Sequence, residues 1–108
     1  MEAPKRENRV FPRKRVSCEG ELVDAVSGNA SPVALLDVSI GGLSFLSARP
    51  CNKGSLWLIR FTLDGESARG VISIAYCVKH SLADSFRIGA EFRNWETAYL
   101  RRIEDYLA

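Results

Sequence analysis

Two runs of alternating apolar and polar residues meet at Asp64-Gly65, and this feature constrains the fold more than any other in the chain. Asp-Gly between two such runs is a strong signal for a tight β-hairpin, because a two-residue hairpin turn needs residues that tolerate positive φ. The alternating positions are Trp57, Ile59, Phe61 and Leu63 before the turn and Gly70, Ile72, Ile74 and Tyr76 after it. The sequence therefore predicts a hairpin of strands over residues 55–63 and 66–78, each with one buried face.

Four more segments have the length and polarity of strands, and turn-forming residues separate them. They cover residues 16–22, 33–38, 43–47 and 86–92. Small residues and a proline at 27–32 predict a loop before the second segment. Gly41-Gly42 predicts a turn before the third, because glycine adopts backbone conformations that other residues avoid.

The C-terminal segment has a different period. Asn94 is a favourable N-cap residue, and apolar residues then recur at helical spacing. These residues are Trp95, Tyr99, Leu100, Ile103, Tyr106 and Leu107. We therefore expect an amphipathic helix over residues 94–107. Six strands joined mostly by short turns and followed by one helix predict a mainly β protein. We expect a six-stranded antiparallel β-barrel with a C-terminal α-helix, because closure removes exposed strand edges.

Charge is unevenly distributed along the chain. Residues 1–15 hold six basic and two acidic residues, a local net charge of +4, whereas the remaining residues have a net charge of −2. Residues 1–8 contain almost no apolar side chains and are expected to form a flexible basic arm. A basic arm on a slightly acidic body suits an anionic partner such as a nucleotide.

Length and composition argue against several classes of protein. A chain of 108 residues fits one domain. No apolar run reaches the roughly 18–20 residues that cross a bilayer, and the charged start lacks a secretory signal, so we expect a cytoplasmic protein without membrane insertion. Cys18, Cys51 and Cys77 form no C-x-x-C pair and His80 is the only histidine, so no metal or cofactor is expected. No nucleophile–base pair or phosphate-cradling loop indicates an enzyme.

Two arginines stand four residues apart at Arg9 and Arg13. Pro12 favours an extended backbone here, in which both side chains point to the same side, about 13 Å apart. The guanidinium fork of arginine matches two phosphate oxygens or the O6/N7 edge of guanine. Taken alone, such a pair is usually solvated charge.

An Asp-x-Ser pattern precedes the paired glycines. In an extended segment Asp37 and Ser39 emerge on the same face, and an ionised carboxylate accepts from the N1–H and amino group of guanine. Gly41 and Gly42 permit a turn and a close backbone approach. Alone, this pattern is usually turn chemistry. With the arginine pair, it indicates a site for a guanine- and phosphate-bearing ligand.

With both motifs, the sequence resembles the PilZ domain family of bacterial receptors for cyclic di-GMP. The family signature is R-x-x-x-R followed by D/N-x-S-x-x-G, and both are complete here at residues 9–13 and 37–42. Residues 86–92 are similar to the family's last strand, with a central glycine and a closing phenylalanine. The resemblance implies a PilZ-like β-barrel domain over residues 9–108, with cyclic di-GMP as its ligand.

The resemblance also implies roles for individual residues. Arg9 and Arg13 would clasp the guanines and phosphates of cyclic di-GMP. Asp37 and Ser39 would bond a guanine edge, and Gly42 would leave room for it.

Further positions are auxiliary candidates. Tyr76 lies where some family members carry an aromatic that stacks on a guanine; the alternative is a barrel-face aromatic that shares the side of Ile72. Asn8 stands where arginine is common in the family, which bears on whether one or two ligand copies bind. Arg6 could partly substitute for that arginine, and Gly41 adjoins the glycine of the motif.

The leading hypothesis is a cyclic di-GMP receptor or adaptor that orders its N-terminal arginine arm on ligand binding and signals to an unidentified downstream protein. One alternative is a small β-barrel that binds single-stranded nucleic acid, but the aromatic residues follow core-like alternation and the body is mildly acidic. Another is a protein-interaction module with a vestigial ligand site.

Overall fold

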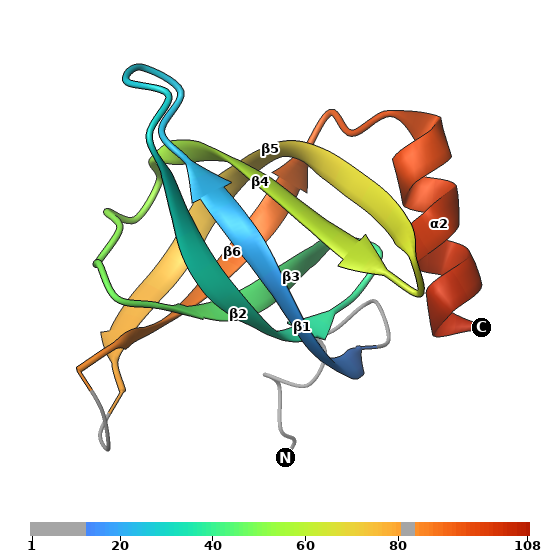
Figure 1. Ribbon diagram of the computed structural model, residues 1–108, viewed down its shortest axis with the longest axis horizontal. Coiled ribbons are helices and arrows are strands. Elements are labelled where there is room, and N and C mark those ends of the chain that lie inside the picture. Colours follow the sequence, from blue (N-terminus) through green and yellow to red (C-terminus); the bar gives the residue numbers. More distant parts are fainter. Residues whose placement is uncertain (1–12, 81–83) are drawn as a thin grey trace, which may run out of the picture.

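The computed structural model describes residues 13–80 and 84–108, and these form six strands followed by one helix. The bounds are β1 Lys14–Val23, β2 Ala30–Val38, β3 Gly42–Ser47, β4 Leu56–Leu63, β5 Glu66–Lys79, β6 Phe86–Arg93 and α2 Thr97–Leu107. Every strand pair is antiparallel, and the strands close in the order β1-β2-β3-β6-β5-β4 (Figure 1). The predicted six-stranded antiparallel barrel with a C-terminal helix is confirmed.

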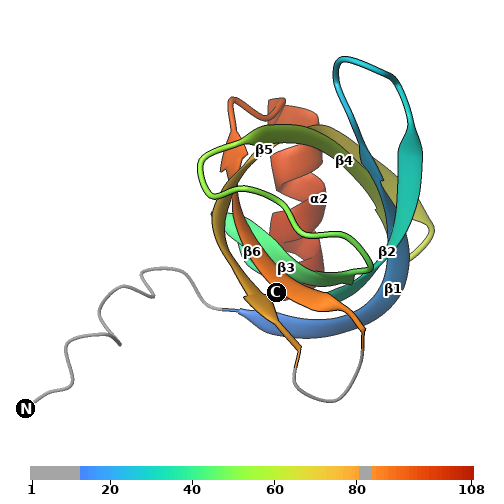
Figure 2. The ribbon, with the colours of Figure 1, turned by 90° about the vertical axis from the view of Figure 1, so that its left-hand side faces the viewer.

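The inward faces of the strands fill the barrel with branched and aromatic side chains. The fully buried ones include Val38, Leu43, Phe45, Ile59, Ile72, Ile74 and Ile88. The β4–β5 hairpin turns at Asp64 and Gly65 with φ of 49° and 81°, as a type I′ turn requires at both central positions. In Figure 2 the strands run round a ring with α2 on its far side.

The second strand begins earlier than predicted. Its first residue is Ala30, so Pro32 lies within β2 and pairs with Glu21 of β1. The preceding turn is shorter because the carboxylate of Asp24 accepts hydrogen bonds from the backbone N–H of Val26 (2.8 Å) and Ser27 (3.1 Å). This tight turn lets the chain resume pairing at once.

The C-terminal helix begins at Thr97, so the predicted start at Asn94 is wrong. Asn94 has φ of 52°, in the left-handed region that asparagine tolerates, and Glu96 takes the N-cap position. The chain bends here because Trp95 turns back onto the barrel, where its Nε1 donates to the carbonyl of Val71 (2.7 Å). The free energy gained by burying the Trp95 indole outweighs the preference of Asn94 for an N-cap position.

The helix α2 packs against β4 and β5 through a face centred on the buried Ile103. Its last turn also contacts the start of β1, because Lys14 Nζ donates to the carbonyl of Tyr106 (3.0 Å) and lies 4.3 Å from that ring's centroid. A cation at a helix C-terminus is favourable because the last carbonyls carry partial negative charge. Across residues 13–80 and 84–108, no helix has the length and apolarity needed to cross a membrane.

Candidate functional site

Ser39 organises the turn between β2 and β3. Its backbone N–H donates to the carbonyl of Gly42 (2.8 Å), and its hydroxyl both accepts from Gly41 N–H (3.2 Å) and donates to the Gly42 carbonyl (3.3 Å). Ser39 is 4% exposed, so this hydroxyl is committed to the turn. The Asp-x-Ser-x-x-Gly segment is therefore a preformed element of the barrel.

Gly42 permits the close approach of β3 and β6. A β-carbon at this position would collide with the carbonyl oxygen of Ala90 and would lie 3.1 Å from the Glu91 Cα. Gly41 contributes to the same junction, because its carbonyl accepts from the N–H of Phe92 (3.0 Å). The missing side chain at Gly42 thus makes room for the β6 backbone. From the sequence it was expected to leave room for a ligand.

Asp37 lies on the outer face of β2 between two arginines. Arg13, immediately before β1, forms an ion pair with its Oδ1, and Nη2 of Arg87, from β6, lies 3.9 Å from its Oδ2. The Asp37 side chain is 17% exposed, so a ligand can reach its oxygens only from the barrel surface. The structure thus brings Arg13 and Asp37 together across 24 residues of sequence. The predicted Arg9, with Asn8 and Arg6, lies outside the described residues.

Tyr76 reaches the outer surface because β5 contains a bulge. The pairing register with β6 shifts between Ile74 and Tyr76, which turns the tyrosine out of the inward row. Tyr76 is 40% exposed whereas Ile72 and Ile74 are buried, so the prediction that the three share a face is wrong. Its ring lies against Gly89 of β6, where a β-carbon would clash with it.

One row of paired residues joins these elements across the outer face. Asp37 pairs with Ser44, Ser44 with Gly89, and Gly89 with Tyr76, so the row crosses β2, β3, β6 and β5. Ser44 is 1% exposed, and within the described part of the chain its Oγ has no hydrogen-bond partner. The row places a carboxylate and an aromatic ring on the same surface.

Sequence reasoning missed Arg87 and Ser44 as members of this site. Ser44 stands between the buried Leu43 and Phe45, so alternation already signals that it faces outward. Nothing in the sequence signals Arg87, because its place beside Asp37 depends on β6 pairing with β3.

The arrangement suits a planar ligand that carries both donors and negative charge. Asp37 offers two acceptor oxygens, the arginines Arg13 and Arg87 offer forked donors, and Tyr76 offers a ring face. A purine with an N–H edge and an attached phosphate has the complementary groups. The described residues hold no group of three or more His, Cys, Asp or Glu side chains that could bind a metal ion.

Cys18 and Cys51 lie in surroundings that disfavour their thiolate forms. Burial and, to a smaller extent, the neighbouring Cys77 together raise the pKa of Cys51 to about 11. Burial also raises the pKa of Cys18. Thiolate is the nucleophilic form, so Cys18 and Cys51 stay protonated and inert at neutral pH.

Comparison with known protein families gives one match over almost the whole chain. The family model described as PilZ domain matches residues 7–108. A comparison with curated proteins found no match.

Solved structures show the same fold. The PilZ domain of YcgR from Escherichia coli with c-di-GMP is 14% identical and has a TM-score of 0.68, covering 87% of this chain and 84% of that one. The MrkH–c-di-GMP complex of K. pneumonia is 17% identical, with a TM-score of 0.71 and coverage of 90% and 49%. The Bacillus subtilis inhibitor of motility MotI/DgrA is 8% identical, with a TM-score of 0.74 and coverage of 89% and 47%. The chain thus spans about half the length of MotI/DgrA and MrkH.

Proposed function

The chain belongs to the PilZ domain family, and from this premise we propose that it is a non-enzymatic receptor for cyclic di-GMP. The observation that carries the proposal is the meeting of Arg13 with Asp37 on the barrel surface, because it joins the two family motifs in one place. The PilZ domain of YcgR and the MrkH protein were each solved with c-di-GMP.

Ligand binding exchanges the partners of Asp37. Its oxygens accept from the N1–H and amino group of one guanine, which releases Arg13 for a phosphate or for the O6/N7 edge of guanine. An exposed ion pair contributes only about 0–1 kcal/mol, whereas a bidentate base contact contributes roughly 1–3 kcal/mol. The exchange is therefore favourable, and the arginine gains new hydrogen-bond acceptors when it leaves Asp37.

Tyr76 supplies the third contact. Its ring lies over Gly89 at the surface, in the same cross-strand row as Asp37. A guanine held by Asp37 along this face stacks on the tyrosine ring. Ser39 and Gly42 act by holding the Asp37 segment in position, with Gly41 beside them.

We further propose that the segment from Arg9 to Arg13 takes its final position when the ligand binds. Ordering about five residues costs roughly 1–2 kcal/mol each in backbone entropy. Micromolar affinity corresponds to about −8 kcal/mol, so several contacts must form together, including those of Arg9. The ordered segment then presents a new surface to a downstream protein, which makes the chain an adaptor.

Isothermal titration with cyclic di-GMP tests the proposal and gives the ligand stoichiometry. We expect binding to the unmodified protein and a loss of roughly 1–3 kcal/mol in the Asp37→Ala variant. Arg13→Ala should show a loss of similar size. The matched control is Glu21→Ala, which removes the carboxylate of a surface ion pair with Arg60 (2.6 Å) outside the site. Absence of binding, or equal affinity in all four proteins, would contradict the proposal.

A further inference from the structure

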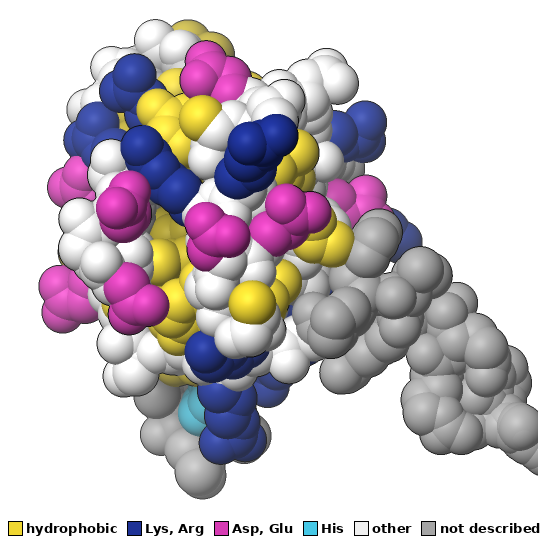
Figure 3. All heavy atoms as spheres, turned by 90° about the vertical axis from the view of Figure 1, so that its right-hand side faces the viewer, with side chains coloured by type: hydrophobic (Ala, Val, Ile, Leu, Met, Phe, Trp, Pro, Cys, Tyr) yellow, Lys and Arg dark blue, Asp and Glu magenta, His cyan; other side chains and the backbone are white. Residues whose placement is uncertain are grey.

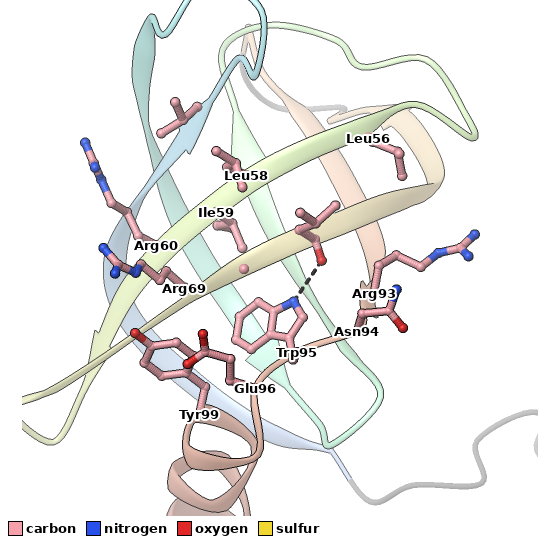
Figure 4. A pocket seen from close by; sticks show the side chains of 13 residues that line it. Leu56, Leu58, Ile59, Arg60, Arg69, Arg93, Asn94, Trp95, Glu96 and Tyr99 are labelled. Atoms are coloured by element: carbon pink, nitrogen blue, oxygen red, sulfur yellow. Dashed lines mark hydrogen bonds between the residues drawn. The ribbon is translucent and has the colours of Figure 1, made fainter.

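A groove lies on a part of the surface that is separate from the proposed cyclic di-GMP site. It has a volume of about 640 Å³ and is lined by residues of β4 and β5, the end of β1 and the segment from Arg93 to Tyr99 (Figure 4). Figure 4 shows Leu56 and Leu58 along β4, with Trp95 facing the groove from the connection to α2. The groove shares no residue with the row from Asp37 to Tyr76.

The floor of the groove exposes apolar side chains where a barrel surface is usually polar. Leu56 is 59% exposed and Leu58 is 38% exposed, although outward positions of a half-buried strand normally alternate as polar residues. Val71 pairs directly with Leu58 and extends this surface onto β5. On the face shown in Figure 3, apolar side chains reach the surface among basic and acidic side chains. These exposed apolar side chains are therefore available for contact with another molecule.

The groove is lined by three arginines, Arg60, Arg69 and Arg93, and by one carboxylate, Glu96, so its rim is predominantly basic. Arg60 and Arg69 stand directly opposite each other on β4 and β5, which is unfavourable for like charges. Glu21 offsets Arg60 through an ion pair, but among residues 13–80 and 84–108 neither Arg69 nor Arg93 has a carboxylate partner. Residues 16–108 have a net charge of −2, so the positive charge at this groove is opposite in sign to the net charge of that part of the chain.

The closed barrel limits the ways in which a partner can bind. The barrel is closed, so its strands offer no free edge to which a partner could add a strand. A partner must therefore bind through side chains. Leu56 and Arg60 lie four residues apart on β4, a span of about 13 Å. Side chains at positions i, i+3 and i+7 of a helix span about 10.5 Å, which fits this length.

We propose that the groove binds an acidic amphipathic helix of a partner protein. Leucine-like side chains of that helix pack on Leu56, Leu58 and Val71, and its carboxylates pair with Arg69 and Arg93. A second copy of this chain fits less well. Its helix α2 carries two basic and two acidic residues, and Ile103 on its apolar face is buried in its own barrel.

A synthetic probe tests this proposal without the natural partner. The probe is a fluorescein-labelled peptide of about 20 residues, because isolated helices shorter than about 12–15 residues are marginal in water. It has leucines at i, i+3 and i+7 and glutamates on the other face. A second peptide has the same composition but its leucines are distributed around the helix. Fluorescence anisotropy should show binding of the first peptide only.

Variants of the full chain locate the binding. Leu58→Asp, and Arg69→Glu combined with Arg93→Glu, should each lower the affinity for the probe about tenfold or more. The matched control is Arg101→Glu, which reverses an exposed charge on α2 outside the groove and should leave the affinity unchanged. Circular dichroism checks the fold of each variant, and the charge reversals serve as a second test if Leu58→Asp unfolds.

Several outcomes would overturn the proposal. They are failure of the probe to bind, equal binding of the redistributed peptide, and equal affinity in the groove variants. Concentration-dependent dimerisation in sedimentation velocity that Leu58→Asp abolishes would assign the groove to a second copy. Titration of cyclic di-GMP in the same variants should give unchanged affinity, so this result is independent of the ligand site.

Discussion

The two halves of the proposed ligand site are held in different ways. The turn from Ser39 to Gly42 is fixed by buried backbone and hydroxyl hydrogen bonds, so its geometry is set before any ligand arrives. Arg13 reaches Asp37 through one ion pair at the surface, where such pairs contribute only about 0–1 kcal/mol. The acceptor Asp37 therefore adjoins a rigid turn, whereas the donor Arg13 can change partners easily.

The largest expected effect is on the stability of the rigid half of the site, the turn from Ser39 to Gly42. Gly42→Ala introduces a β-carbon against the Ala90 carbonyl in the β3–β6 pairing. Backbone cannot yield as a flexible side chain does, so we expect a loss of about 3 kcal/mol in the free energy of unfolding. The melting temperature should fall by roughly 10–20 °C in calorimetry.

The control for Gly42→Ala is Gly28→Ala. Gly28 has φ of 79° but nothing within 4 Å of its β-carbon position, so alanine adds backbone strain without a collision. This variant should lose only about 1–2 kcal/mol. Equal losses in the two variants would show that the β3–β6 junction is not rigid.

A smaller effect is expected from Ser39→Ala. The change leaves the N–H of Gly41 without its acceptor, which should cost about 1–2 kcal/mol of unfolding free energy in urea titrations. Ser44→Ala is the matched control, because its buried hydroxyl has no partner among the described residues and its removal should be neutral or stabilising. Destabilisation by Ser44→Ala alone would reverse this assignment.

The smallest expected effect concerns Arg87, which lies with Arg13 beside Asp37 in the part of the site where arginines can change partners. Arg87 lies 3.9 Å from Asp37 and is half-exposed, so Arg87→Ala should weaken cyclic di-GMP binding by less than about fivefold. Arg87→Lys, which retains the charge, should restore most of the loss. Calorimetry that finds Arg87→Ala as damaging as Arg13→Ala would mean that both arginines grip the ligand.

Local sequence patterns predicted most of the fold because they act over a few residues. Alternation identified the buried faces of β4 and β6, and Asp64-Gly65 specified a hairpin turn whose positive φ values the structure shows. The same reasoning failed where a distant contact decides the conformation. Asn94 has the chemistry of a helix cap, but the docking of Trp95 on β5 delays the helix to Thr97.

The site was predictable only in its motif residues. The placement of Tyr76 depends on a single extra residue in the β5–β6 ladder, and a one-residue change of register moves a side chain to the other face. Arg87 reaches Asp37 because β6 lies beside β3, which is a property of the strand order. Neither fact has a signature in the local sequence.

Lys14 limits how far Arg13 can travel. Its backbone pairs with Val38 in β2, and its side chain is bound to the last turn of α2 at Tyr106. The Cα atoms of Arg13 and Lys14 are about 3.8 Å apart, so Arg13 is anchored one residue away from a fixed point. Its exchange between Asp37 and a ligand is therefore a swing of the guanidinium about a stationary pivot, and the C-terminal helix holds that pivot in place.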